Sequence, residues 1–138
     1  MKRREFMGLT AAVLVAPMAA KASETLDYTP GLVRERLAAG ETVFVDFKAS
    51  WCTTCRAQER VIGQLRADNP AYDEAITFIN ADWDEYGRGE LATELNIPRR
   101  STLVVMKGEE ELARVVARTS RGDIQALMDT ALAASEAS

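Results

Sequence analysis

The sequence contains no histidine, and this absence excludes several kinds of chemistry. Without an imidazole the chain cannot form the Ser–His or Cys–His pairs that activate many nucleophiles, nor any zinc site that needs histidine ligands. Cysteine is scarce too, since Cys52 and Cys55 are the only two and cannot by themselves build a four-cysteine metal site. The pair could serve as a disulfide, a dithiol or half of an intermolecular metal site.

Beyond the first few positions the sequence has no run of basic residues, and the formal net charge is −4. Because contacts with phosphates supply most of the affinity of nucleic-acid-binding proteins, we expect no nucleic-acid partner. A length of 138 residues, with 47% apolar and 28% charged residues, suits one soluble domain with a modest core.

The N-terminal segment has the features of an export signal. A basic head that includes Arg3 and Arg4 precedes a short apolar stretch at 8–20, well under the roughly 18 residues that suggest a transmembrane helix. Ala20-Lys21-Ala22 fits the small-x-small cleavage rule, so we expect residues 1–22 to be a signal peptide and 23–138 to be the mature domain. The sequence Arg3-Arg4-Glu5-Phe6-Met7 resembles a twin-arginine signal, and an ordinary secretory signal fits almost as well. An uncleaved anchor and an ordinary N-terminal helix are the alternatives.

The predicted mature chain of 116 residues has a formal net charge of −7. In a two-membrane bacterium an exported chain of this kind would be periplasmic, where disulfides persist.

Beyond residue 22, apolar spacing and turn residues predict four helices and four strands. The helices are expected from Thr29-Pro30 to Gly40, over 56–67, over 90–95 and after Ser120; the strands over 42–48, 76–80, 101–107 and 112–116. A polar loop is expected at 82–87, a hairpin connection at 108–111 and a frayed tail at 133–138. The order predicts an α/β domain with a mixed central sheet and helices on both faces.

Cys52 and Cys55 lie where the first long strand ends and a helix begins. At a helix start the backbone N–H groups are unpaired and the helix dipole favours an anion, so a thiolate at Cys52 would be stabilised there. Cys55, one turn further along, could resolve a mixed disulfide formed at Cys52. The alternative is a structural disulfide or two inert core thiols. A bridge across two residues closes a very short loop and removes little entropy from the unfolded chain, which favours redox chemistry.

The segment 45–56, Val-Asp-Phe-Lys-Ala-Ser-Trp-Cys-Thr-Thr-Cys-Arg, resembles the active-site segment of the thioredoxin superfamily. The resemblance extends, less specifically, over nearly the whole mature domain. It implies the thioredoxin-like fold, with Cys52 as nucleophile and Cys55 as resolving cysteine. It also implies that Asp46 accepts the proton of the resolving thiol and that Trp51 shields the site.

The position of Asp46 independently suggests a perturbed carboxyl group. A carboxylate within an apolar strand costs several kcal/mol unless it is paired or protonated, and a raised pKa would make it a useful base. The alternative is that Asp46 is solvated at the strand end or paired with Lys48, which points to the same face two residues on.

The sequence departs from the family pattern at three places. Lys48 stands where an aromatic residue is usual, and Arg60 replaces a kinking proline, so the active-site helix is expected to run straighter. The family has a cis-proline before the strand that faces the cysteines. An ungapped alignment puts Ser101 there and Arg100 just before it, where a guanidinium would favour the Cys52 thiolate. In the rival alignment Pro98 faces the cysteines and 99–101 form a bulge.

The leading functional hypothesis is an enzyme, a thiol–disulfide oxidoreductase that exchanges disulfides with other exported proteins. Thr53 and Thr54 between the cysteines replace the histidine of strongly oxidising relatives, which favours a reductase kept reduced by a membrane electron donor. We expect a monomer with no resident metal and no cofactor beyond the Cys52–Cys55 disulfide. The alternatives are a dimer that binds a metal or an iron–sulfur cluster through the same cysteines, and a redox-inert binding module.

Overall fold

The structure, a computed structural model, describes residues 24–137, so the proposed signal peptide at 1–22 lies outside the described residues. Its centre is a five-stranded sheet in the order β1-β3-β2-β4-β5. The strands are β1 (Leu26–Asp27), β2 (Thr42–Lys48), β3 (Ile76–Asp82), β4 (Thr102–Lys107) and β5 (Glu110–Val116). β3 runs parallel to β1 and β2, whereas β4 runs antiparallel to β2 and β5. The predicted mixed sheet is therefore confirmed.

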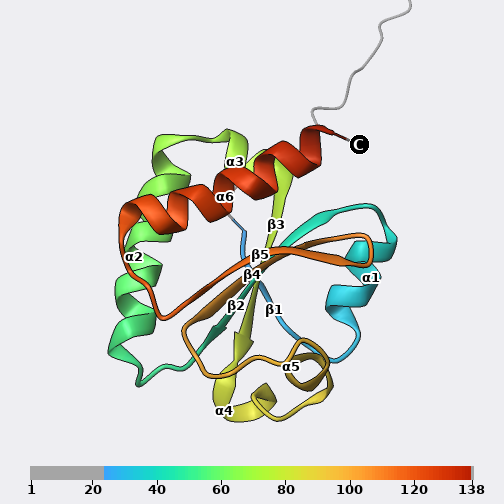
Figure 1. The fold of residues 1–138 in the computed structure, drawn as a ribbon, viewed down its shortest axis with the longest axis vertical. Coiled ribbons are helices and arrows are strands. Elements are labelled where there is room, and N and C mark those ends of the chain that lie inside the picture. Colours follow the sequence, from blue (N-terminus) through green and yellow to red (C-terminus); the bar gives the residue numbers. More distant parts are fainter. Residues whose placement is uncertain (1–23, 138) are drawn as a thin grey trace, which may run out of the picture.

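Helices cover both faces of this sheet, as the sequence predicts (Figure 1). One face is covered by α2 (Thr53–Asp68), α3 (Ala71–Ala75) and α6 (Arg121–Glu136), the other by α1 (Leu32–Ala38), α4 (Trp83–Tyr86) and α5 (Glu90–Glu94). Phe44 and Phe78 point into the first core, and Val43, Val45 and Ile79 into the second. This alternation follows from the two-residue period of a strand.

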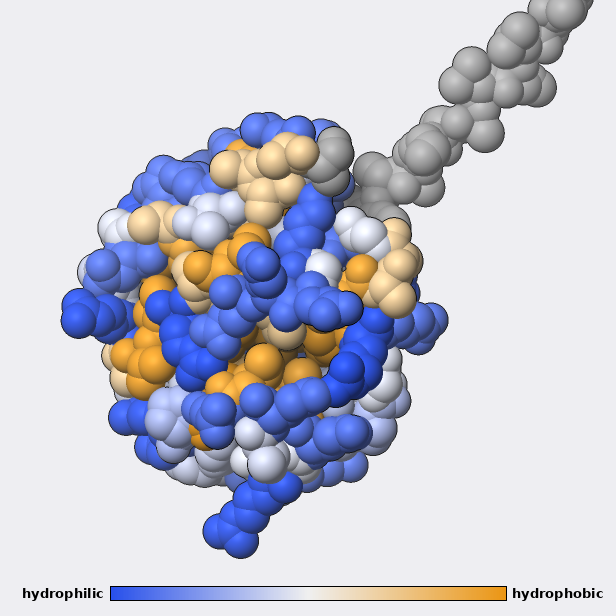
Figure 2. All heavy atoms as spheres, turned by 45° about the vertical axis from the view of Figure 1, so that its right-hand side comes forward, coloured by the Kyte–Doolittle hydropathy of each residue, from blue (hydrophilic) through white to orange (hydrophobic). Residues whose placement is uncertain are grey.

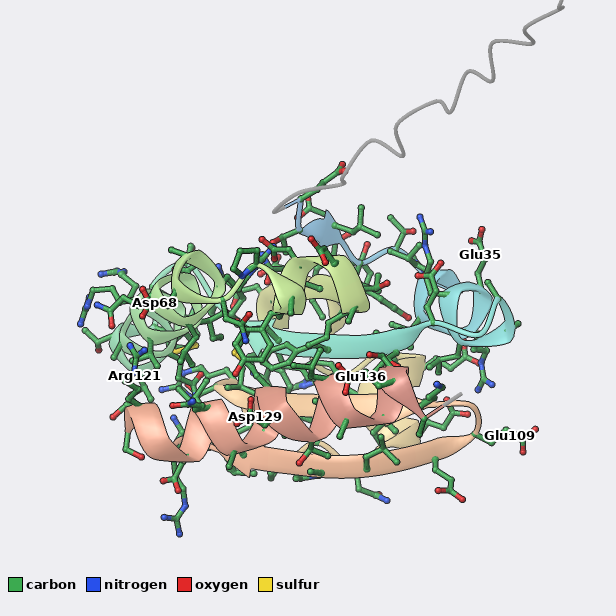
Figure 3. All side chains as sticks on the ribbon, turned by 90° about the horizontal axis from the view of Figure 1, so that it is seen from above. Glu35, Asp68, Glu109, Arg121, Asp129 and Glu136 are labelled. Atoms are coloured by element: carbon green, nitrogen blue, oxygen red, sulfur yellow. A yellow bond between two sulfur atoms is a disulfide. The ribbon has the colours of Figure 1, made fainter. Side chains whose placement is uncertain are left out.

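Figure 3 shows how α2 and α6 are joined at the surface. Arg121, in the first turn of α6, lies against Asp68 at the end of α2, with 2.8 Å between Nη2 and Oδ2. Both side chains are about half exposed, and exposed ion pairs contribute at most about 1 kcal/mol. The apolar contacts of Ile62, Leu65, Leu127 and Met128 beneath this pair therefore supply most of the stabilisation.

Two local predictions were wrong and two short elements were not predicted, in each case because a tertiary contact outweighs the local signal. β1 was not predicted, since its two residues become a strand only by pairing with β3. α3 was not predicted either: Pro70 follows the end of α2 and at once begins a new helix, in which Tyr72 is buried. The predicted loop at 82–87 contains α4, whose Trp83 packs edge-on against Phe47. The predicted frayed tail is helical to Glu136, where Lys107 donates to the carbonyl of Ala134 at 2.8 Å.

The surface carries few large exposed hydrophobic side chains. Figure 2 brings the right-hand side of Figure 1 forward and shows hydrophobic residues in groups separated by hydrophilic ones. Among the described residues, Trp51 is the one large hydrophobic side chain that is exposed, at 53%. The helices of residues 24–137 are all too short or too polar to span a bilayer. The exposed Trp51 immediately precedes Cys52 of the cysteine pair.

Candidate active site

Cys52 and Cys55 occupy the N-terminal end of α2, where β2 delivers the chain. They form a disulfide with 5.2 Å between their Cα atoms. Cys52 is the N-cap of α2, and its Sγ accepts a hydrogen bond from the backbone N–H of Cys55 at 3.0 Å. The sulfur thus takes the place of the oxygen that usually caps a helix. The Cys55 N–H, which has no partner within the helix, and the positive end of the helix dipole are both directed at the atom that becomes a thiolate on reduction.

The two cysteines differ little in burial, although Cys52 lies at the helix start and Cys55 one turn further along. Cys52 is 2% exposed and Cys55 is 1% exposed, and both pack with Ala49 and Trp83. Its position at the helix start, rather than its exposure, therefore favours Cys52 as the nucleophile.

Trp51 and Arg100 form a stacked pair beside the cysteines. The Arg100 guanidinium lies 4.6 Å from the centre of the Trp51 ring, and the Trp51 indole N–H donates to the Asp84 carboxylate at 3.0 Å. A cation over an aromatic face is attracted by the ring's quadrupole. Arg100 was expected to face the sulfurs; here its guanidinium stacks on the residue next to Cys52, and its Nε is buried without a hydrogen-bond partner.

Ser101, not Pro98, contacts the two sulfurs. Its hydroxyl oxygen lies 3.2 Å from Cys52 Sγ and 3.1 Å from Cys55 Sγ, and the residue is fully buried. Pro98 is exposed in the loop that leads to β4, and no cis peptide bond occurs within residues 24–137. The ungapped alignment therefore describes the site, and the rival alignment, with Pro98 facing the cysteines, is wrong.

Gln58 is a site residue that the sequence analysis missed. Its side chain is fully buried, and Nε2 donates to the carbonyl of Ser101 at 3.1 Å and to that of Arg118 at 3.0 Å. A signal was available: Gln58, Ile62 and Leu65 follow the helical spacing of a buried face, and Gln58 is the polar member. A buried amide at such a position needs partners, and it finds two backbone carbonyls here.

Asp46 is buried in the middle of β2, on the face that α2 covers. The residue is 4% exposed and its Oδ1 has no hydrogen-bond partner. Burial, which removes the carboxylate from water, raises the pKa of Asp46 to about 7; the Lys48 charge lowers this pKa and the Glu59 charge raises it. The alternative, a carboxylate that is solvated at the strand end or paired with Lys48, is wrong, because Asp46 is buried and the Lys48 ammonium pairs with Glu59 on α2.

A hollow of about 700 Å³ opens beside this arrangement. Its lining includes Lys48, Cys55 and Glu59, together with residues of β1, β3 and α4. Water in this hollow would reach the side of the site where the Lys48–Glu59 pair lies. The geometry therefore combines a sulfur pair at a helix start, a buried carboxyl group whose pKa is raised to about 7, and a hollow lined by Lys48, Cys55 and Glu59.

Comparisons with known proteins agree with this geometry. The family model "Thioredoxin" matches residues 24–130. Thioredoxin H5 of Oryza sativa subsp. japonica is 32% identical over 108 residues, which cover 69% of this chain and 76% of the rice protein. Thioredoxin-1 of Saccharomyces cerevisiae is 31% identical over 80 residues, covering 58% of this chain and 72% of the yeast protein.

Solved structures show the same fold. A protein titled Trxlp from Edwardsiella tarda superposes with a TM-score of 0.67 at 24% identity, covering 76% of this chain and 98% of that one. The thioredoxin of Schistosoma mansoni superposes with a TM-score of 0.62 at 22% identity, covering 77% and 94%. The family model, the relatives in sequence and the cysteine pair show that the chain belongs to the thioredoxin family and is a thiol–disulfide oxidoreductase.

Proposed function

We propose that this protein reduces disulfides of other exported proteins in the periplasm, after cleavage of residues 1–22. The observation that carries the redox part is the Cys52–Cys55 pair at the start of α2, with the buried Asp46 carboxyl nearby. Export is supported by the basic head and short apolar stretch of the N-terminal segment. As proposed here, the protein works as a monomer, needs no cofactor beyond its own disulfide, and is reduced again by a membrane electron donor.

The reaction proceeds in two exchanges. The Cys52 thiolate attacks one sulfur of the substrate disulfide, forms a mixed disulfide and releases the other substrate sulfur as a thiolate, which takes a proton from solvent. The Cys55 thiol then gives its proton to the Asp46 carboxylate and attacks Cys52 Sγ. This step forms the Cys52–Cys55 disulfide and releases the second substrate sulfur. The substrate gains two electrons and the protein loses two, so a dithiol donor must restore Cys52 and Cys55.

Two experiments test this proposal. The redox equilibrium of the pair against glutathione separates reductase from oxidase, since about 30 mV is a tenfold change for a two-electron couple. A potential well above that of glutathione would contradict the reductase direction.

Reduction of insulin disulfides should be lost in Cys52→Ser, whereas Cys55→Ser should accumulate a mixed disulfide at Cys52. Full activity in Cys52→Ser would contradict the mechanism and favour a redox-inert module.

The role of Cys52 has a direct test as well. Limiting iodoacetamide near neutral pH should label Cys52 in the reduced protein, because the thiolate is the reactive form and the helix start favours it. Predominant label on Cys55 would reverse the two roles.

No observation favours the iron–sulfur or metal alternative. Such a dimer would share four thiolates, yet both sulfurs are nearly buried and contact the Ser101 hydroxyl. Colour or bound metal in the purified protein, with four cysteines per site, would nevertheless identify it.

A further inference from the structure

The Ser101 hydroxyl lies between the two sulfurs of the active site. Its oxygen is 3.2 Å from Cys52 Sγ and 3.1 Å from Cys55 Sγ, within the range of hydrogen bonds to sulfur. A disulfide carries no hydrogen, so in this oxidised form the hydroxyl must be the donor. Because the hydroxyl has one hydrogen and two lone pairs, after reduction it can donate to one sulfur while it accepts from the other.

The backbone holds Ser101 in this place at a conformational cost. Its φ of 65° is in the left-handed region, which is uncommon for residues other than glycine. Three hydrogen bonds fix the residue: its N–H donates to Phe47 O at 2.7 Å, and its carbonyl accepts from Ala117 N–H at 2.8 Å and from the Gln58 amide at 3.1 Å. A strained residue that its surroundings fix in this way, at a reactive site, suggests a functional role.

We propose that Ser101 is a catalytic residue whose hydroxyl donates a hydrogen bond to the Cys52 thiolate while accepting one from the Cys55 thiol. This inference rests on the proposed function, since it concerns the dithiol form that attacks substrates. Reduction of the disulfide by two electrons and one proton gives the Cys52 thiolate and the Cys55 thiol. The hydroxyl keeps its own hydrogen and no covalent bond to it forms or breaks.

The consequence is a thiolate with two directed donors, the Cys55 N–H and the Ser101 hydroxyl. Hydrogen bonds to a charged acceptor are roughly twice as strong as neutral ones, and a buried site strengthens them further. The hydroxyl therefore increases the thiolate fraction of Cys52 at neutral pH. It also favours the reduced form, which makes the protein more oxidising than it would be with an apolar residue at 101.

The test compares Ser101→Ala and Ser101→Gly in the reduced protein. Both variants lack the hydroxyl, but glycine adopts a positive φ without strain, so it separates the loss of the donor from a backbone effect. The measurement is the pH titration of thiolate absorbance near ~240 nm, where thiolates but not thiols absorb. Ser50→Ala is the control, because Ser50 is an exposed serine two residues before Cys52.

We expect the titration midpoint of Cys52 to rise by about one pH unit or more in both Ser101 variants, about a tenfold loss of thiolate below the midpoint. The glutathione equilibrium should shift by a similar factor towards the disulfide, and Ser50→Ala should match the parent. An unchanged or lowered midpoint in both variants overturns the proposal. A rise in Ser101→Ala alone also overturns it, because it would assign the effect to strain.

These outcomes are separable from a failure of the proposed function. The titration needs no substrate. The proposed function fails, by contrast, if the thiolate of Cys52 forms in the parent protein as expected but the protein does not reduce insulin.

Discussion

At the scale of single residues, the buried carboxyl group of Asp46 links stability to pH. The folded protein keeps the proton of Asp46 up to a pKa of about 7, whereas the unfolded chain releases it near its ordinary value of 3.8. Between these values the folded state binds more protons than the unfolded state, so the free energy of unfolding falls as pH rises. The stabilising contribution of Asp46 to the free energy of unfolding is fully present below about pH 4 and is lost as the pH rises through about 7.

Replacing Asp46 with asparagine should therefore stabilise the oxidised protein at alkaline pH. Asparagine cannot ionise, so the variant avoids the cost of a buried carboxylate, which amounts to up to about 4 kcal/mol above pH 7. Urea unfolding of parent and variant at pH 4.5 and pH 8.5 (conditions chosen roughly on either side of the titration) measures the difference. A gain at pH 8.5 that does not exceed the gain at pH 4.5 would contradict the assigned titration.

The same variant should slow the Cys55 exchange about 10²–10⁴-fold, with little effect on the Cys52 exchange.

The charges of Lys48 and Glu59 should tune Asp46 in opposite directions. The Lys48 ammonium lowers the pKa of Asp46 and the Glu59 carboxylate raises it. We therefore expect Lys48→Met to move the midpoint of the pH profile of the Cys55 exchange to higher pH, and Glu59→Gln to move it to lower pH. Stopped-flow kinetics of mixed-disulfide resolution between pH 5 and pH 9 (a range spanning roughly two units on either side of the expected midpoint) measures both. Shifts of the same sign would mean that breaking the ion pair, rather than its charges, controls the rate.

At the scale of elements, α2 combines a catalytic end with a structural body. It runs as one helix from Thr53 to Asp68, through the position of Arg60 where the family pattern has a proline. Its inner face packs Ile62 and Leu65 into the core, while Gln58 on the same face anchors the loop that carries Ser101. One helix therefore positions Cys52, Cys55 and, through the Gln58 amide, the residue opposite them.

The last helix has a conventional cap whose removal should be independent of the redox site. Ser120 is the N-cap of α6, and its hydroxyl oxygen accepts from the N–H of Asp123 at 3.1 Å. Ser120→Ala should lower the free energy of unfolding by about 1 kcal/mol, and Ser120→Asn should restore most of it, because asparagine caps equally well. Denaturant unfolding measures both variants, and the glutathione equilibrium should not change. Equal losses in the two variants would show that the cap bond is not the cause.

At the scale of the whole molecule, the predicted export depends on residues 1–22, and expression in cells tests it. Full-length protein produced in a two-membrane bacterium should appear in the periplasm and begin at Ser23, as N-terminal sequencing or intact mass would show. Replacing both Arg3 and Arg4 with lysine should block export only if the twin-arginine route is used. Retention of residues 1–22 on protein recovered from membranes would instead support the uncleaved anchor.

How much could be predicted from the sequence depended on the range of the interactions. The strand at 42–48 and the helix that begins after Cys52 were predicted because apolar spacing and β-branched residues act locally. The two-residue β1 and the short α4 were not, because one needs its partner strand and the other a tryptophan packed on Phe47. Local sequence carries little information about contacts of that kind.

For the active site, the reactive chemistry follows from the sequence alone: two cysteines lie three positions apart at a strand-to-helix junction, with an aspartate inside the preceding strand. The surroundings of these three residues depend on the folding of the whole chain. The fold places Ser101 rather than Pro98 against the sulfurs and stacks Arg100 on Trp51. It also pairs Lys48 with Glu59, so that Asp46 Oδ1 is buried without a hydrogen-bond partner. The reason is physical: residues 46, 58 and 101 are brought together by sheet pairing and helix packing, and their contacts join positions far apart in the chain.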